Sequence, residues 1–293
     1  MNGKPYKIRH IRTWRAFDAF EANSLDCIYR GQGNSKWELA SGYERCKRVL
    51  DPAYEKEMLH EFLTQAGAYE TRLPSATDYV SWFALMQHYG AKTRLLDVTR
   101  SKYIALFFAL EDMASHKGCG AVWALDMYGY NVSTYNHLLK SSNNSVIDTR
   151  SVLLASALEE YKELGWRFAA HFIASDWEGE LSRQLADSIV KKHEENMIPF
   201  LRAGGVLEVV PQIRNKRMIA QSAEFLMPIT LRKSFMENLF NEGVDGGAQF
   251  MPRVTKLIIH RGCYAEMRKK LVDMNITWQT IYPDLTGLAM SVN

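Results

Sequence analysis

The chain has 293 residues, of which 47% are hydrophobic, so it can bury a large core as one domain or as two small ones. Its 36 Lys and Arg residues against 33 Asp and Glu are too balanced for overall charge to require a nucleic-acid partner. Two short basic clusters can each be interpreted as a local basic groove or as solvated surface. They are Arg9, Arg12 and Arg15, and Arg214, Lys216 and Arg217.

No stretch approaches the roughly 18 apolar residues that a membrane helix needs, and the first fifteen residues carry no secretory signal. We therefore expect a cytoplasmic protein. The four cysteines form no CxxC pair, which argues against a zinc site and a dense disulfide framework. No metal is expected.

The first half of the chain predicts strands alternating with helices. A helix beginning Asp51-Pro52 is favoured because aspartate can cap it and proline fits its first turn. The helix over 78–88 is apolar on nearly every side, so we expect it to be buried on most faces. The predicted elements are a strand at 25–29, helices at 51–70, 78–88 and 102–113, and a strand at 120–125.

The second half predicts a helical insertion followed by more strands and helices. A polar Ser/Asn loop and two amphipathic stretches place the insertion at about 131–202. After it we expect strands at 206–210, 224–229, 254–259 and 278–281, helices at 232–241 and 264–274, and a last turn entering a short helix. The predicted fold is a single mixed α/β (α+β) domain, 1–293, with a core of about 25–130 and 203–293. Its central sheet would be mixed or mainly antiparallel and flanked by helices.

Tyr29-Arg30-Gly31-Gln32 is the first of four segments whose polar residues local structure does not require. The glycine lets the backbone pass close to a ligand, and the planar fork of Arg30 suits phosphate or carboxylate. The alternative is an arginine paired to a buried carboxylate, and the local sequence leaves both interpretations open.

The second segment is Gln87-His88-Tyr89-Gly90 followed by Thr93-Arg94-Leu95-Leu96-Asp97-Val98-Thr99. Charged groups beside buried leucines must be paired or must line a cavity. A pocket satisfies this requirement, and so does an internal network of Arg94 with Asp97. His88 alone is also compatible with an ordinary core histidine.

The third and fourth segments lie late in the chain. Residues 217–226 form a polar turn with Gln221 that leads into a strand with Glu224. Tyr282-Pro283-Asp284 is typical of a proline turn that closes a fold.

Together, the four segments resemble the FRG domain, a bacterial and phage family named for a Phe-Arg-Gly motif. Residues 29–32 match that motif with tyrosine for phenylalanine, and 87–99 resemble its Gln-His-Tyr-Gly and Thr-Arg-Leu-Leu-Asp block. The resemblance continues in Arg217-Met218, Gln221 and Phe225 and in the closing Tyr282-Pro283-Asp284-Leu285. It runs from about 27 to 290 and omits the insertion. The departures are Lys92 for a proline, Val98 for an aromatic residue and Ala223 for a glycine.

The order of motifs is also similar to that of the ADP-ribosyltransferases, which implies NAD as a substrate. In those enzymes an arginine grips NAD, a Ser/Thr strand supports the nicotinamide pocket, and a glutamate faces the ribose, where positive charge develops. The resemblance implies that Arg30 holds the pyrophosphate and that Thr99 and Ser101 sit on the supporting strand. It also implies that Tyr89 stacks on nicotinamide and that either Gln221 or Glu224 faces the ribose. The spacing of these last two puts them on opposite faces of a strand, so only one can enter a pocket.

The candidate catalytic residues are therefore Glu224, Gln221 and His88. The candidate ligand-binding residues are Arg30, Gly31, Gln32, Tyr89, Arg94, Asp97, Thr99 and Ser101.

Three functions compete at this stage. The first is an NAD-consuming transferase or glycohydrolase, a toxin or defence effector with a protein or nucleic-acid acceptor. The second is a non-catalytic module that binds a phosphorylated ligand or nucleic acid through Arg30, Arg94 and the 214–217 cluster. The third is a nuclease with His88 as base and Asp97 as its partner, although the lone histidine of 191–195 supplies no metal set. In each case we expect the insertion to shape specificity or bind a partner.

Overall fold

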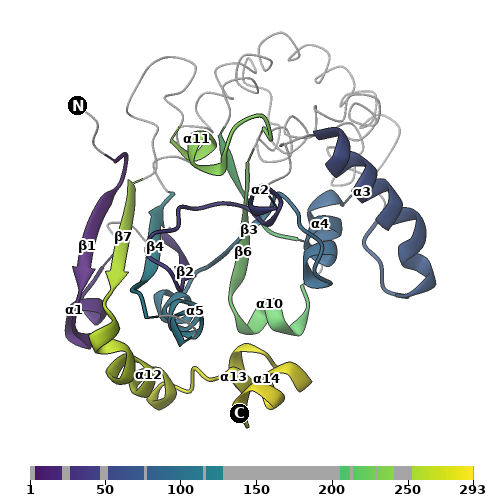
Figure 1. Ribbon diagram of the computed structural model, residues 1–293. Helices are drawn as coiled ribbons and strands as arrows, with labels where there is room; N and C mark the ends of the chain where they lie inside the picture. Colours follow the sequence, from purple (N-terminus) through teal and green to yellow (C-terminus); the bar gives the residue numbers. More distant parts are fainter. Residues whose placement is uncertain are drawn as a thin grey trace, which may run out of the picture.

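The computed structural model describes residues 4–21, 27–46, 52–75, 78–114, 117–127, 205–211, 214–228, 230–240 and 253–292. The predicted helical insertion at 131–202 lies outside these residues. Within the described residues, seven strands form one sheet in the order β1-β7-β4-β2-β3-β6-β5 (Figure 1). The strands are β1 Lys7–Ile11, β2 Cys27–Gln32, β3 Leu96–Thr99, β4 Gly120–Asp126, β5 Val206–Val209, β6 Ala223–Pro228 and β7 Arg253–Ile259.

Neighbouring strands of this sheet run antiparallel, except that β1 pairs in parallel with β7. The prediction of an α+β fold with a mixed, mainly antiparallel sheet is confirmed. Strands from before and after the predicted insertion pair with one another in the same sheet, because β7 pairs with both β1 and β4, and β6 pairs with β3.

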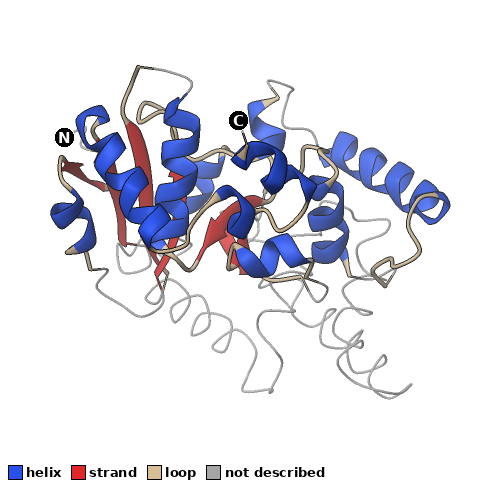
Figure 2. Ribbon diagram, turned by 90° about the horizontal axis from the view of Figure 1, so that it is seen from below, coloured by secondary structure: helices blue, strands red, loops and turns tan. Residues whose placement is uncertain are grey.

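Helices cover the sheet and extend beyond its ends, and many lie in front of the strands when the molecule is seen from below (Figure 2). The α-helices are α1 Trp14–Asp18, α2 Gly42–Arg45, α3 Pro52–Gln65, α4 Tyr79–His88, α5 Lys102–Ala114, α10 Lys216–Ala220, α11 Phe235–Leu239, α12 Tyr264–Asp273, α13 Trp278–Ile281 and α14 Leu285–Ser291. Short 3-10 turns occur at Ala66–Ala68 and Arg261–Cys263. No helix of the described residues is long and apolar enough to span a bilayer.

The core forms on both faces of the sheet. Helix α4 is buried on most sides, as its sequence predicts, and packs with α3 against β6. Helix α5 packs on β2 and β4 within a second cluster that also includes Phe17 of α1 and Met267 of α12. Trp123 of β4 is fully buried in a third cluster with Leu226 of β6 and Phe235 of α11. The sheet is thus a rigid support for whatever its loops and strand ends display.

The strand predicted over 278–281 is wrong, because these residues form helix α13. Thr277 caps the helix by accepting from the Thr280 backbone N–H, and the Thr280 side chain accepts from the Thr277 N–H in return. The helical turn also brings Trp278 and Tyr282 into stacking contact, with ring centroids 5.3 Å apart. Capping and aromatic contact override the strand preference of a short Trp and Ile segment.

Strand β1 and helix α1 are missing from the sequence predictions. Four of the five residues of β1 are exposed, and only Ile11 is buried, so the strand carries no apolar pattern. Its pairing with β7, which is far away in the sequence, holds it in place. A strand of this kind cannot be recognised from local periodicity.

Candidate functional site

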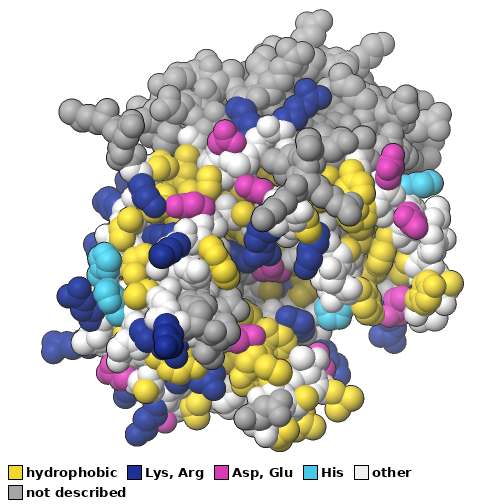
Figure 3. Space-filling view, in the orientation of Figure 1, with side chains coloured by type: hydrophobic (Ala, Val, Ile, Leu, Met, Phe, Trp, Pro, Cys, Tyr) yellow, Lys and Arg dark blue, Asp and Glu magenta, His cyan; other side chains and the backbone are white. Residues whose placement is uncertain are grey.

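The segments singled out in the sequence come together where the sheet opens between β2 and β3. These two strands share a single bridge, Tyr29 with Thr99, whereas β3 pairs with β6 over four residues. Because β2 and β3 diverge from that bridge, a cleft of about 240 Å³ forms beside it. It is lined by Tyr29, Arg30, Gly31, Asp97, Val98, Thr99, Phe108, Glu111, Arg217, Gln221, Ala223 and Tyr282. A hollow near the centre of the face shown in Figure 3 lies in this part of the molecule.

Arg30 spans the opening from β2 to β3. Its Nη1 donates to the backbone carbonyl of Asp97 at 2.5 Å and lies 3.6 Å from Asp97 Oδ2. The Arg30 side chain is 13% exposed and that of Asp97 is 59% exposed. Arg30 therefore pairs with a carboxylate at the mouth of the cleft, and its side chain lines the cleft.

Asp97 is held by the helix that carries the second motif. Gln87 Nε2 donates to Asp97 Oδ1 at 2.7 Å, and Gln87 Oε1 accepts from Thr93 Oγ1 at 2.6 Å. These hydrogen bonds hold the carboxylate in place. They give the polar side chains of Gln87, Thr93 and Asp97 a structural role that needs no ligand.

Gly31 is required by packing. A Cβ at this position would lie 1.9 Å from the Ala105 carbonyl oxygen and 2.7 Å from the Ala109 nitrogen, both in α5. The sequence suggested that the glycine admits a ligand, but the group that approaches it is the backbone of α5. Gly31 still lines the cleft, whose floor is fixed by this close contact of strand and helix.

Thr99 and Gln221 are joined at the inner end of the cleft. Thr99 Oγ1 donates to the Gln221 carbonyl at 2.7 Å, and Gln221 Nε2 donates to the Ile281 carbonyl at 3.2 Å. Gln221 is the C-cap of α10 and precedes β6. The following residue, Ser222, has a φ of 45°, a left-handed conformation that disfavours side chains other than glycine, Asn and Asp. Ala223, which stands where the family has a glycine, therefore directly follows this strained residue.

Aromatic rings and a second arginine form another wall. The Arg217 guanidinium lies 4.2 Å from the centre of the Tyr282 ring, which also contacts Phe108 edge-on at 6.3 Å. A cation held over a ring is favourable where it is partly removed from water. The proline turn at 282–284 therefore places Tyr282 in the cleft as well as closing the fold.

Arg94, a predicted ligand-binding residue, does not lie in the cleft. Its side chain and that of Glu55 on α3 are both fully buried, with Arg94 Nη2 2.6 Å and Nε 2.8 Å from Glu55 Oε2. Arg94 Nη1 also donates to the Pro228 carbonyl at 3.4 Å. The predicted internal network exists, but its acid is Glu55 and not Asp97. Burial of both charges explains why Arg94 is unavailable to a ligand.

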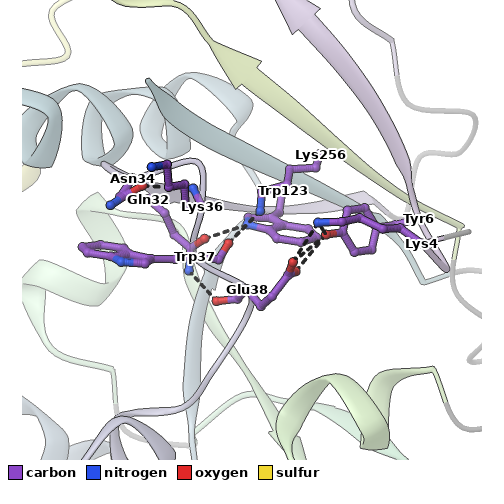
Figure 4. Close-up of polar contacts among 9 residues, drawn as sticks. All are labelled: Lys4, Tyr6, Gln32, Asn34, Lys36, Trp37, Glu38, Trp123 and Lys256. Atoms are coloured by element: carbon purple, nitrogen blue, oxygen red, sulfur yellow. Dashed lines mark hydrogen bonds and ion pairs between the residues drawn. The ribbon is translucent and has the colours of Figure 1, made fainter. Parts of the chain in front are cut away.

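Glu224 and Gln32 also point away from the cleft. Arg100 Nε donates to Glu224 Oε2 at 2.9 Å, and Arg100 also pairs with Glu208 of β5. Gln32 is buried among the residues of Figure 4, where its Oε1 accepts from Trp123 Nε1 at 2.7 Å and its Nε2 donates to the Glu38 carbonyl at 3.2 Å. Of the pair Gln221 and Glu224, only Gln221 lines the cleft, which agrees with the expectation that one of them could.

His88, Tyr89 and Ser101 lie near the cleft lining without being part of it. The His88 ring contacts Tyr89 and lies 3.4 Å from Asn215 Nδ2. Desolvation, and then Arg217, lower the pKa of His88, while Asp284 opposes the shift. Tyr89 lines a separate, mainly apolar groove beside α3, and Ser101 accepts from the Ile104 N–H at the start of α5.

Glu111 of α5 is a lining residue that sequence reasoning missed. It lies one helical turn after Phe108, also a lining residue, and residues three apart share a helix face. That spacing was the signal available in the sequence. Among the described residues, no three His, Cys, Asp or Glu side chains gather as a metal-binding group, and residues 191–195 lie outside this set.

Comparison with known proteins agrees with the first two motif segments, at 29–32 and 87–99. The family model of the FRG domain matches residues 26–118, a range that contains β2, β3 and α5 and ends just before β4. That range includes Arg30, Asp97, Thr99 and Glu111, whereas the lining residues Arg217, Gln221 and Tyr282 lie beyond it. No curated protein and no solved structure matched the chain.

Proposed function

We propose that the cleft of this FRG-domain protein, whose domain spans residues 26–118, binds NAD and that the protein is an ADP-ribosyltransferase or NAD glycohydrolase. One observation carries the proposal: β2, β3 and β6, the strands on which the resemblance to those enzymes depends, are consecutive in the sheet, and Arg30, Thr99 and Gln221 line one cleft.

The binding roles follow from charge and shape. Arg30 and Arg217 supply two guanidinium groups, the side chain best suited to a pyrophosphate because its planar fork binds two oxygens at once. Tyr282 and Phe108 form an aromatic wall on which a heterocycle can stack. The resemblance to the ADP-ribosyltransferases had implied that Tyr89 stacks on the nicotinamide. Thr99 acts indirectly by fixing the backbone of Gln221.

The reaction breaks the bond between the nicotinamide nitrogen and C1′ of the ribose. Nicotinamide leaves with the bonding electrons, and an acceptor nucleophile or water forms the new bond to C1′ and loses its proton. Positive charge at C1′ needs a nearby anion or dipole. Because Glu224 is committed to Arg100, we assign the dipole to the Gln221 amide and the formal negative charge to Glu111.

The experiment measures NAD binding by calorimetry and nicotinamide release by chromatography in the full chain. Arg30→Lys keeps the charge but loses the planar fork, and we expect NAD affinity to fall about tenfold or more. Glu111→Gln should lower turnover about a hundredfold with little change in affinity. Arg72→Lys and Glu57→Gln, both exposed and outside the cleft, are the matched controls. If the wild-type protein neither binds NAD nor releases nicotinamide, the proposal is wrong.

The non-catalytic alternative is favoured by the two arginines in one cleft. It predicts that ADP-ribose and other diphosphates bind with an affinity that depends on Arg30, while NAD stays intact in the presence of bacterial extract. Binding without turnover would thus replace the enzyme by a phosphate-ligand module.

A further inference from the structure

A second charged surface lies on the edge of the sheet farthest from β5. Six basic side chains make up this basic edge, five on β1, α1 and α12 and one in the turn between β1 and α1: Lys7, Arg9, Arg15, Lys269, Lys270 and, in the turn, Arg12. All six are exposed. Figure 3 shows Lys and Arg side chains gathered along the left side of the molecule, where Figure 1 places β1, α1 and α12.

The fold brings the two halves of the basic edge together. Glu266 of α12 accepts from the Trp14 N–H of α1 at 3.2 Å, so the two helices touch at that point. Lys269 and Lys270 are three and four residues after Glu266, on the same helix face, and therefore lie beside α1. On the strand side, β1 is the edge strand and pairs with β7.

Charge is distributed unevenly between this edge and the rest of the chain. Residues 4–21 and 253–274 contain eleven Lys and Arg against four Asp and Glu, a net charge of +7, whereas the whole chain has only +3. Of the eleven, Lys256 is buried and Lys4 pairs with Glu38, so the other nine supply the surface charge. Two of the four acids make internal hydrogen bonds: Glu266 with Trp14, and Asp18, which accepts from Tyr103 Oη at 2.6 Å. The near-neutral total therefore conceals a strongly positive edge.

We propose that the basic edge binds the phosphate backbone of a nucleic-acid duplex. A row of exposed, long cationic side chains on a rigid strand and helix suits a repeating array of phosphates. An anionic membrane fits less well, because Met267 and Leu271 of α12 are buried in the core and leave Val272 and Met274 as the large apolar residues that this helix and its C-cap expose. The proposal is independent of NAD, since none of the six residues lines the cleft.

The test is fluorescence anisotropy of a labelled, mixed-sequence duplex DNA with the full chain, and in a second arm a duplex RNA of the same sequence. For about five phosphate contacts, affinity should fall roughly 500-fold between about 50 and 200 mM salt. The variant Arg12→Glu/Lys269→Glu/Lys270→Glu should bind more than about tenfold more weakly and reduce the salt slope by about three. Circular dichroism would check its fold, and the corresponding triple Gln variant serves if charge reversal disturbs it.

The matched control is Arg72→Glu/Lys92→Glu/Arg232→Glu, which changes net charge equally at exposed positions elsewhere. Loss of duplex binding in the edge variant alone supports the proposal, and the two arms show whether DNA or RNA is preferred. Equal losses in both variants would show attraction to overall charge only and overturn it. Absence of duplex binding at about 50 mM salt, or binding to phosphatidylserine vesicles in its place, would overturn it as well.

Discussion

Two arginine and carboxylate pairs flank the start of β3, and they differ in almost every physical respect. Arg94 and Glu55 are sealed between α3 and the sheet, with both side chains fully buried. Arg30 and Asp97 meet at the mouth of the cleft, where the carboxylate is 59% exposed and 3.6 Å from the guanidinium. The first pair can serve the fold, and the second remains accessible to a ligand. Burial of the acid, more than the presence of an arginine, separates a structural site from a binding site.

The largest effect is expected from breaking the buried ion pair of Arg94 and Glu55. Glu55→Ala leaves a buried guanidinium without its carboxylate and should lower the free energy of unfolding by about 3–5 kcal/mol. Asp97→Ala removes an exposed partner and should cost no more than about 1 kcal/mol. Urea denaturation followed by circular dichroism measures both. Similar midpoints for the two variants would remove the distinction between the pairs.

The next largest effect concerns Gly31, which forms part of the floor of the cleft beside Arg30 and Asp97. Gly31→Ala puts a Cβ against the backbone of α5, and neither main chain can move without disturbing the core, so we expect a loss of about 3 kcal/mol or more. Gly42→Ala is the control, because the nearest atoms to its Cβ would be at 3.6 Å. If Gly31→Ala unfolds at the same urea concentration as the wild type, strand and helix are not in the close contact described.

The smallest effect tests whether charges around the cleft act on one another. Arg217→Gln removes a positive charge that lowers the pKa of His88, so that pKa should rise toward its ordinary value of 6.5. Asp284→Asn removes the opposing negative charge and should lower the same pKa further. NMR titration of the imidazole resonances measures both shifts, with His260 on the far edge as internal control. A His88 pKa that responds to neither substitution would place these charges too far away.

Much of the fold was predictable because its central elements carry their own signals. Helix α4 is apolar all round, α5 repeats that pattern, and β4 is a short apolar run after a glycine. Strand β1 and helix α13 were not predictable in the same way, since a distant strand and a local capping arrangement determine them.

The candidate site was predictable only in part. Arg30, Asp97, Thr99 and Gln221 do line one cleft. The sequence could not reveal that Arg94 forms its ion pair with Glu55, because the two residues are 39 positions apart and no local pattern links them. Glu111 was missed for the related reason that a lone carboxylate on a helix is usually solvated surface.

The parallel pairing of β1 with β7 has a consequence for biosynthesis. Lys7 pairs with Thr255, so β1 cannot pair with β7 until about 250 further residues have been synthesised. Tyr282, which completes the cleft wall, emerges later still. A nascent chain would therefore lack a finished cleft until Tyr282 has left the ribosome.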